Sequence, residues 1–373
     1  MKVTRIEAIP VAYPEPNDND ATRHLLFVRM TADDGTTGWG EAVTMWPEAT
    51  LACAAIVDGL AGLVLGRDPL EHAALHSEFR QHTWWYGVGG IAAFAISALD
   101  IALWDLAGKA TGRSLLDLLG GPVHSGLPAL VSCHATQEDL DEMAATMAGW
   151  VREHAAAGIK VGFGKRGDAR LGVDHDRDVA FVAALRRELG PGPSIMIDIG
   201  ASVHWDVATA IRRTRAFEEF GIAWIEEPLG ADDPAGYAEL RSGVATKIAY
   251  GEREWTPRGV QRIVDTGTVD VVGVDPGRCE GVTGWREAAA HTRAGGREIN
   301  AHAWSSAIVT AASLALSFAT PNCHQVEIKP LANPMQHELS SSPPLPRAGV
   351  FARPEAPGLG VEIRPGVLDR YRL

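Results

Sequence analysis

The chain has 373 residues, 46% of them hydrophobic, which is enough for a large core and suits one large domain with a smaller one. Its formal net charge of −13 and pI near 5.5 exclude the basic surface that a nucleic-acid-binding protein needs. An anionic substrate is not excluded, because a bound cation reverses the local field.

The first 125 residues predict a small α+β domain. Residues 1–42 have the pattern of a β-hairpin region, with Asp34-Gly35 as the turn between HLLFVRM and TTGWGEA. From about Pro47 to Gly120 the apolar residues recur at helical spacing. Gly121-Pro122 then marks a boundary.

Residues 126–344 alternate short apolar runs with amphipathic helical segments, which predicts parallel βα units. Seven or eight such units favour a TIM-type barrel over an open doubly wound sheet, and no Gly-x-Gly-x-x-Gly follows the first strand. The Pro-rich segment 345–373 is expected to return to the N-terminal domain. The predicted strands are LPALVSCH (127–134), GIKVGFGK (158–165), SIMIDIG (194–200), AWIEEPL (223–229), TKIAYGE (246–252), VDVVGVDP (269–276) and REINAHA (297–303).

Most of these predicted strands end in a charged or titratable residue. Such ends share one mouth of a parallel barrel, where TIM barrels place their active sites. Carboxylates that converge there repel one another unless a cation neutralises them. Oxygen ligands without a thiolate cluster favour Mg²⁺, then Mn²⁺. The residues are Lys165, Asp198, Glu226, Glu227, Glu252, Asp275 and His302.

Several motifs in this order resemble the mandelate racemase / muconate lactonizing enzyme branch of the enolase superfamily, over essentially the whole chain. They are GWGEA (38–42), ALDIALWDLAGKATGRSLLDLLGG (98–121), IMID (195–198), WIEEP (224–228), GE (251–252), EGVTGW (280–285) and His302. The resemblance implies a modified (β/α)7β barrel, with an α+β capping domain of residues 1–125 joined by 345–373, over a catalytic domain of 126–344. It also implies a Lys or His base and Mg²⁺.

By this resemblance the metal ligands are Asp198, Glu226 and Glu252. Glu227 is expected to point elsewhere, because neighbours on a strand face opposite ways. Asp275 and His302 form an Asp–His dyad, in which the carboxylate orients the imidazole and stabilises its cation.

Lys165 is the base expected on the opposite face of the substrate, and here the chain departs from the family pattern. Phe163-Gly164-Lys165 stands in place of the usual Lys-x-Lys. Strand alternation predicts Phe163 and Lys165 on one face and Lys160 with Gly164 on the other. Lys160 is the alternative base. Two other departures are Gly200, where the family often has Asn, and Arg278, where lysine is common.

A further group of residues is expected to contact the substrate. Glu327 corresponds to a family glutamate that hydrogen-bonds the substrate carboxylate. Aromatic and imidazole side chains in the capping domain suit the faces of a sugar, although a packed interdomain hinge explains them equally well. The candidates are Glu327, His24, Trp46, His82, Tyr86, Trp304 and Lys160.

The expected reaction is metal-dependent removal of the proton α to a carboxylate, giving an ene-diolate. Dehydration of an aldonate or aldarate to a 2-keto-3-deoxy acid is favoured; a sugar-acid lactone cycloisomerase and a racemase or epimerase are the alternatives. A non-catalytic relative stays open as another class. The resemblance further implies a homo-oligomer, an octamer or a smaller even assembly.

Cysteine usage and hydropathy indicate a cytoplasmic protein. No Cys-x-x-Cys pair occurs among the scattered cysteines, so disulfides and zinc knuckles are not expected. The N-terminus lacks the apolar core of a signal peptide, and no run of eighteen apolar residues predicts a membrane span. The cysteines are Cys53, Cys133, Cys279 and Cys323.

Overall fold

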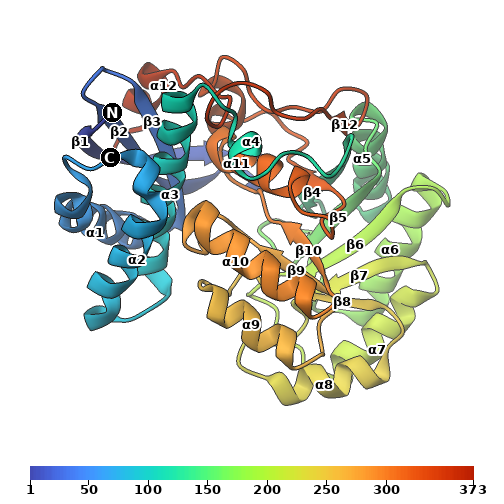
Figure 1. The fold of residues 1–373 in the computed structure, drawn as a ribbon. Helices are drawn as coiled ribbons and strands as arrows, with labels where there is room; N and C mark the ends of the chain where they lie inside the picture. Colours follow the sequence, from blue (N-terminus) through green and yellow to red (C-terminus); the bar gives the residue numbers. More distant parts are fainter.

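The computed structural model describes residues 1–373, and Figure 1 shows a smaller α+β part beside a larger barrel. The smaller part is an antiparallel sheet in the order β1-β2-β3, against which α1 and α3 pack, while α2 packs on these two helices. Its elements are β1 (Val3–Glu15), β2 (Ala21–Ala32), β3 (Thr37–Met45), α1 (Pro47–Val64), α2 (His72–Thr83), α3 (Gly90–Thr111) and the short α4 (Leu115–Leu118).

The larger part is a nearly closed parallel barrel of eight strands, so the predicted fold class is confirmed. The hydrogen-bonded order is β10-β9-β8-β7-β6-β5-β4-β11, and the seam lies between β10 and β11. The sequence prediction missed β11, a strand of only three residues. The strands are β4 (Leu127–His134), β5 (Gly158–Phe163), β6 (Ser194–Ile199), β7 (Ile222–Glu226), β8 (Lys247–Tyr250), β9 (Val271–Val274), β10 (Glu298–Ala301) and β11 (Val326–Ile328).

Helices follow the strands on the outside of the barrel, and most begin at a side chain that accepts a hydrogen bond from the first turn. Such caps satisfy amides that have no partner within the helix, which is why Asp, Ser and Thr mark these starts. The helices are α5 (Leu140–Glu153), α6 (His175–Leu189), α7 (Val207–Glu218), α8 (Pro234–Gly243), α9 (Pro257–Asp265), α10 (Gly281–Ala294) and α11 (Ala307–Phe318), of which all but α10 have such a cap.

Strand alternation divides each barrel strand between two environments. Outward side chains such as Val161, Ile197 and Ile225 join the main hydrophobic core beneath the helices. Inward side chains form a separate apolar layer inside the barrel, with polar groups nearer the mouth. The layer consists of Leu130, Met196, Trp224, Ala249 and Val271.

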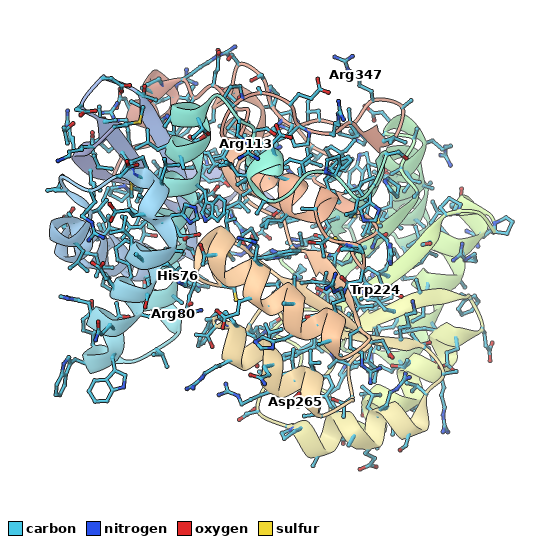
Figure 2. The ribbon with its side chains drawn as sticks, in the orientation of Figure 1. His76, Arg80, Arg113, Trp224, Asp265 and Arg347 are labelled. Atoms are coloured by element: carbon cyan, nitrogen blue, oxygen red, sulfur yellow. The ribbon has the colours of Figure 1, made fainter.

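Helix α3 joins the two parts, because it packs on β3 and on α10 (Figure 1). Asp100 on α3 accepts hydrogen bonds from the Thr283 amide and hydroxyl at 2.8 and 2.6 Å, at the start of α10. Figure 2 shows His76 and Arg80 on α2, beside the same region of α10. Arg80 Nε lies 2.5 Å from Glu280 Oε2, so the junction is held by buried polar contacts.

The C-terminal segment returns to the N-terminal part, as expected. Strand β12 (Val350–Phe351) pairs with β4, and helix α12 (Pro365–Tyr371) packs on β1. The Leu373 amide donates to the Pro10 carbonyl at 3.0 Å. The domain boundaries near residues 125 and 344 stay a prediction.

Two helices are long and apolar enough to cross a membrane by composition alone, α1 and α3. Helix α3 is a core helix here, with 83% of its apolar window buried, and α1 packs one face on β1 and α3. All four cysteines are buried and free, as expected from their spacing.

Candidate active site

A cavity of about 300 Å³ opens at the mouth of the barrel, among the carboxyl ends of its strands. Both parts of the molecule line it. The smaller part contributes Asp18, Arg23, Met45 and Trp46. The barrel contributes the charged residues Lys160, Lys165, Arg166, Asp198, Glu252 and Arg278, the imidazoles of His134 and His302, and Trp304.

The three predicted metal ligands come from adjacent places on the barrel. Asp198 and Glu226 are register partners on β6 and β7, and Glu252 follows β8. Each carboxylate contacts a basic side chain: Asp198 Oδ2 lies 3.5 Å from Lys165 Nζ, Glu226 Oε1 lies 3.0 Å from Lys160 Nζ, and Glu252 Oε2 lies 3.0 Å from His302 Nε2. They therefore do not converge on one point as the ligands of a single ion in this structure.

The charges at the mouth nevertheless fit a divalent cation. The connected network of ion pairs has five carboxylates and three permanent cations; when Asp18, Arg23 and Arg166 of the cavity lining are counted as well, one negative charge is in excess with His302 neutral. The available donors are carboxylate oxygens without a thiolate, which suits a hard ion such as Mg²⁺. The carboxylates are Asp198, Glu226, Glu252, Asp275 and Glu327, and the cations are Lys160, Lys165 and Arg278.

The buried floor of the site is built around Lys160, whose ammonium lies between Glu226 and Glu327 at 3.0 and 2.9 Å. Trp224 Nε1, on β7 (Figure 2), donates to Glu226 Oε2 at 3.1 Å. Asn300 Nδ2 donates to Glu327 Oε1 at 2.7 Å across the seam of the barrel. Burial raises the pKa of Glu226 to about 7, although the positive charge of Lys160 acts to lower it.

Glu227 points away from this floor, as predicted for the second glutamate of the motif. Its φ of 47° turns the chain just after β7, and its carboxylate pairs with Arg253 Nε at 2.7 Å. Glu227 is 3% exposed and does not line the cavity. Its place is therefore structural, beside the site.

His302 is fixed by neighbours on both ring nitrogens. Nδ1 lies 2.8 Å from Asp275 Oδ2, and Nε2 lies 3.0 Å from Glu252 Oε2. Burial opposes the imidazolium, but Glu252 and Asp275 outweigh burial and raise the pKa of His302. The structure thus brings the predicted Asp–His pair together, and Arg278 Nε lies 3.6 Å from the same Asp275 oxygen.

The loop after His302 is held by Glu41, the acid of the GWGEA motif. The Glu41 carboxylate accepts from the Ser305 and Ser306 hydroxyls and from the Val309 amide, at the start of α11. It is fully buried. The N-terminal sheet therefore positions the end of β10 directly.

Lys165 reaches the cavity by a route that the sequence prediction did not foresee. Phe163 faces outward, where its ring packs against Phe181 and Phe217 with centroids 5.8 and 6.1 Å apart. Lys160, Gly164 and Lys165 all line the cavity, so the predicted sharing of one face by Phe163 and Lys165 is wrong. The strand ends at Phe163, and alternation does not extend beyond it.

The charge of Lys165 is governed by the carboxylates of the mouth. Burial opposes the ammonium form, but Asp198 and Glu252 outweigh burial and raise the pKa of Lys165. Lysine is an effective base only when its pKa is brought down towards neutrality, so positive charge added at these carboxylates would favour that role.

The predicted substrate contacts divide into three groups. Trp46, Trp304 and Lys160 line the cavity. Glu327 lies beneath Lys160 rather than at the surface of the cavity. The third group lies outside the cavity, because its members project from β2, from the last turn of α2 and from the 3-10 turn after it: His24, His82 and Tyr86.

His134 and Asp18 were missed by the sequence analysis. His134 ends β4, and its ring stacks on Trp304 with centroids 4.6 Å apart. Its Nδ1 lies 3.1 Å from Asp18 Oδ1, which belongs to the loop after β1. The strand-end rule that selected His302 applies equally to the His of LPALVSCH; only Asp18 lacked a signal in the sequence.

Comparison with known proteins agrees with this architecture. Residues 17–120 match the family model of the mandelate racemase / muconate lactonizing enzyme N-terminal domain. Residues 142–367 match the model described as enolase C-terminal domain-like. Together the two models cover most of the chain.

Among characterised relatives, D-galactarolactone cycloisomerase of Agrobacterium fabrum is 30% identical, covering 95% of this chain and 92% of that protein. The 3,6-anhydro-alpha-L-galactonate cycloisomerase of Streptomyces coelicolor is 32% identical over 94% and 90%. D-gluconate dehydratase of Thermoproteus tenax is 28% identical over 99% and 74%.

Solved structures show the same fold across the whole chain. The 3,6-anhydro-D-galactonate cycloisomerase of Zobellia galactanivorans superposes with a TM-score of 0.90 at 26% identity, covering 100% of both chains. A racemase of Streptomyces coelicolor with bound magnesium gives 0.87 at 27% identity, also over 100% of both. The chain therefore belongs to the mandelate racemase / muconate lactonizing enzyme family of the enolase superfamily, and it is an enzyme of the lyase and isomerase group found there.

Proposed function

We propose that the enzyme removes the proton α to the carboxylate of an acid sugar and then expels an oxygen from the β-carbon. Dehydration of an aldonate or aldarate to a 2-keto-3-deoxy acid is the first form of this reaction. The observation that carries the proposal is the placement of two basic groups, Lys165 and His302, in one cavity with carboxylates between them.

The strand order supports opposed roles for these two groups. Lys165 follows β5 and His302 follows β10, with β6 to β9 between them in the sheet. A substrate seated in the cavity would have Lys165 on one side and His302 on the other. One takes the α-proton, and the other delivers a proton to the departing oxygen.

Asp198, Glu226 and Glu252 would hold Mg²⁺, for which the excess of negative charge and the oxygen donors are suited. Bound there, the ion would supply positive charge that stabilises the developing ene-diolate. Lys160 and Arg278 are the cations placed to bind the substrate carboxylate from the protein side.

Asp275 would keep the His302 ring in one orientation, because it accepts from Nδ1 and leaves Nε2 for the substrate. Trp46 and Trp304 offer aromatic faces to the carbon skeleton. The cavity volume of about 300 Å³ is at the lower end of the range of small-molecule sites, about 300–1,000 Å³.

Opening of a sugar-acid lactone is a second candidate, and it is favoured by the two cycloisomerases at 30% and 32% identity. It uses the same first step. The leaving group is then the ring oxygen of the substrate in place of a hydroxyl, so the same acid and base serve both reactions.

The test is a Mg²⁺-dependent assay of aldonates, aldarates and their lactones, with products identified by NMR in D₂O. A 2-keto-3-deoxy acid with deuterium at C3, formed from an acyclic aldonate or aldarate with loss of water, supports dehydration; the same kind of product formed from a lactone without loss of water supports cycloisomerisation. Exchange of the α-proton without elimination would point to a racemase or epimerase. If no acid sugar is turned over and none loses its α-proton, the proposal is wrong.

The cytoplasmic location and the even-numbered homo-oligomer stay predictions. Sedimentation velocity of the purified enzyme would measure the assembly directly.

A further inference from the structure

The last inward-facing position of β5 carries no side chain. Ile159, Val161 and Phe163 face the helices and belong to the main core. Lys160 and Gly162 therefore face the barrel interior, and both line the cavity. A lysine at position 162 would point directly into the mouth of the barrel, but this residue is a glycine.

The side chain of Lys165 fills the space over Gly162. A Cβ atom added to Gly162 would lie 2.6 Å from Lys165 Cε and 3.1 Å from Lys165 Cγ. On the far side it would lie 2.9 Å from His134 Cδ2. The aliphatic stem of Lys165 thus lies where the side chain of residue 162 would otherwise lie.

Gly200, after β6, completes the same space from the neighbouring strand. A Cβ atom there would lie 2.7 Å from the Phe163 carbonyl oxygen, and 3.2 and 3.3 Å from Lys165 Cε and Cδ. Neither Gly162 nor Gly200 has a positive φ, so neither is required by its backbone conformation. What both contribute to this region is the absence of a side chain.

The chain turns back at Gly164, which has a φ of 66°. The Gly164 amide donates to the Leu171 carbonyl at 3.0 Å, and the Ser202 hydroxyl donates to the Gly164 carbonyl. The Gly200 amide donates to the Phe163 carbonyl at 2.9 Å. These bonds fix the loop so that Lys165 points back over the strand towards Asp198.

We propose that Gly162 and Gly200 are positioning residues that form a seat for the Lys165 stem, through which a lysine rooted in the loop delivers its ammonium to the mouth. The inference deepens the proposed function, since it explains how the β5 side of the substrate acquires a base. The stem is flexible, so a side chain at Gly162 would displace the lysine rather than unfold the barrel. At Gly200 an added Cβ would also press on the Phe163 carbonyl, so the melting temperature of the Gly200→Ala variant is measured beside its activity.

The main test is Gly162→Ala, with Gly200→Ala as a second variant. Gly273→Ala is the matched control, because Gly273 is also an inward-facing strand glycine but nothing lies within 4 Å of its added Cβ. Crystal structures of the first two variants should show Lys165 Nζ moved away from Asp198 Oδ2. α-Proton exchange in D₂O should fall about 100-fold, the loss expected for a displacement on the order of 1 Å.

A relocation variant distinguishes a seat from a merely structural role. In the Lys165→Ala variant the lysine stem no longer fills the space over Gly162. The additional substitution Gly162→Lys places a lysine side chain in that space. The exchange rate of the double variant should be at least tenfold higher than that of Lys165→Ala. A solvent-exposed lysine elsewhere could not produce that recovery.

A measurement that needs no substrate tests the position of Lys165 independently of the proposed reaction. Reductive methylation followed by mass spectrometry reports the accessibility of Lys165 among the six lysines without any substrate. Increased methylation in Gly162→Ala but not in Gly273→Ala supports the seat, even if Lys165→Ala keeps its activity and the proposed reaction fails. An unmoved and equally protected Lys165 in Gly162→Ala would overturn the inference.

Discussion

Two groups of carboxylates in this molecule come from equally recognisable motifs but have different partners. Glu41 and Asp100, at the junction of the two parts, accept from backbone amides and hydroxyls. Asp198, Glu226 and Glu252, at the mouth of the barrel, contact the basic groups of Lys165, Lys160 and His302.

The difference separates acids that cap the backbone from acids whose side-chain partner a cation could replace. A backbone amide is fixed by the fold, so a carboxylate bound to it acts as a permanent cap. An ammonium or imidazole on a side chain can move or lose its proton, so its carboxylate partner can accept a cation instead. The partner indicates the role only together with a place at the cavity, since Glu227 also has a basic partner, Arg253, but does not line the cavity.

Removing divalent cations should have the largest effect, and it should act on Asp198, Glu226 and Glu252 at the mouth of the barrel. We expect EDTA treatment to abolish turnover and α-proton exchange, because the three carboxylates of the mouth then lack a bound cation and the ene-diolate has no counter-charge. Added Mg²⁺ should restore both. Full activity after exhaustive chelation, verified by metal analysis, would exclude the proposed cation site.

His302→Asn should lower kcat by a factor of roughly 10²–10⁴, the contribution usual for a general acid or base. The junction acids are untouched, so the melting temperature should change by only a few degrees. Exchange on the Lys165 side should persist if Lys165 is the base. Loss of elimination with retained exchange would then assign the acid role to His302, whereas unchanged kcat would remove His302 from the reaction.

Asp105→Ala should affect stability rather than chemistry. The Asp105 carboxylate accepts from the Trp39 and Leu359 amides, each at 2.8 Å, and pairs with Lys109 Nζ at 2.7 Å. Its removal leaves buried donors without acceptors, which should cost about 3 kcal/mol in urea unfolding. The specific activity of the folded fraction should stay near that of the wild type; a large loss of kcat would contradict the distinction drawn above.

Tyr86→Ala should have the smallest effect. Tyr86 is 54% exposed and does not line the cavity, although the sequence made it a candidate substrate contact. We expect kcat/KM to stay within about twofold of the wild type, whereas Trp304→Ala, within the cavity, should raise KM. A loss of tenfold or more in Tyr86→Ala would show that the loop after α2 closes on the substrate.

Much of this architecture could be predicted from the chain. The apolar runs from LPALVSCH to REINAHA became β4 to β10, because a buried parallel strand needs a continuous apolar segment whatever its neighbours are. Strand β11 was missed because its three residues are too few to show a period. Acids at strand ends predicted the site, since parallel strands must all point their carboxyl ends to one mouth.

The sequence by itself determined the barrel and its charged mouth, because those follow from local periodicity and from the shared direction of the strands; the pairing of Asp275 with His302 was implied by the resemblance of its motifs to the family. Only the tertiary structure decided which side chains enter the cavity beyond the strand ends, where the two-residue alternation stops. Phe163 turned outward, Lys165 folded back over Gly162, and His24, His82 and Tyr86 stayed outside. Beyond a strand end no repeat fixes a side chain's direction, so it is set by contacts between residues that are far apart in the sequence.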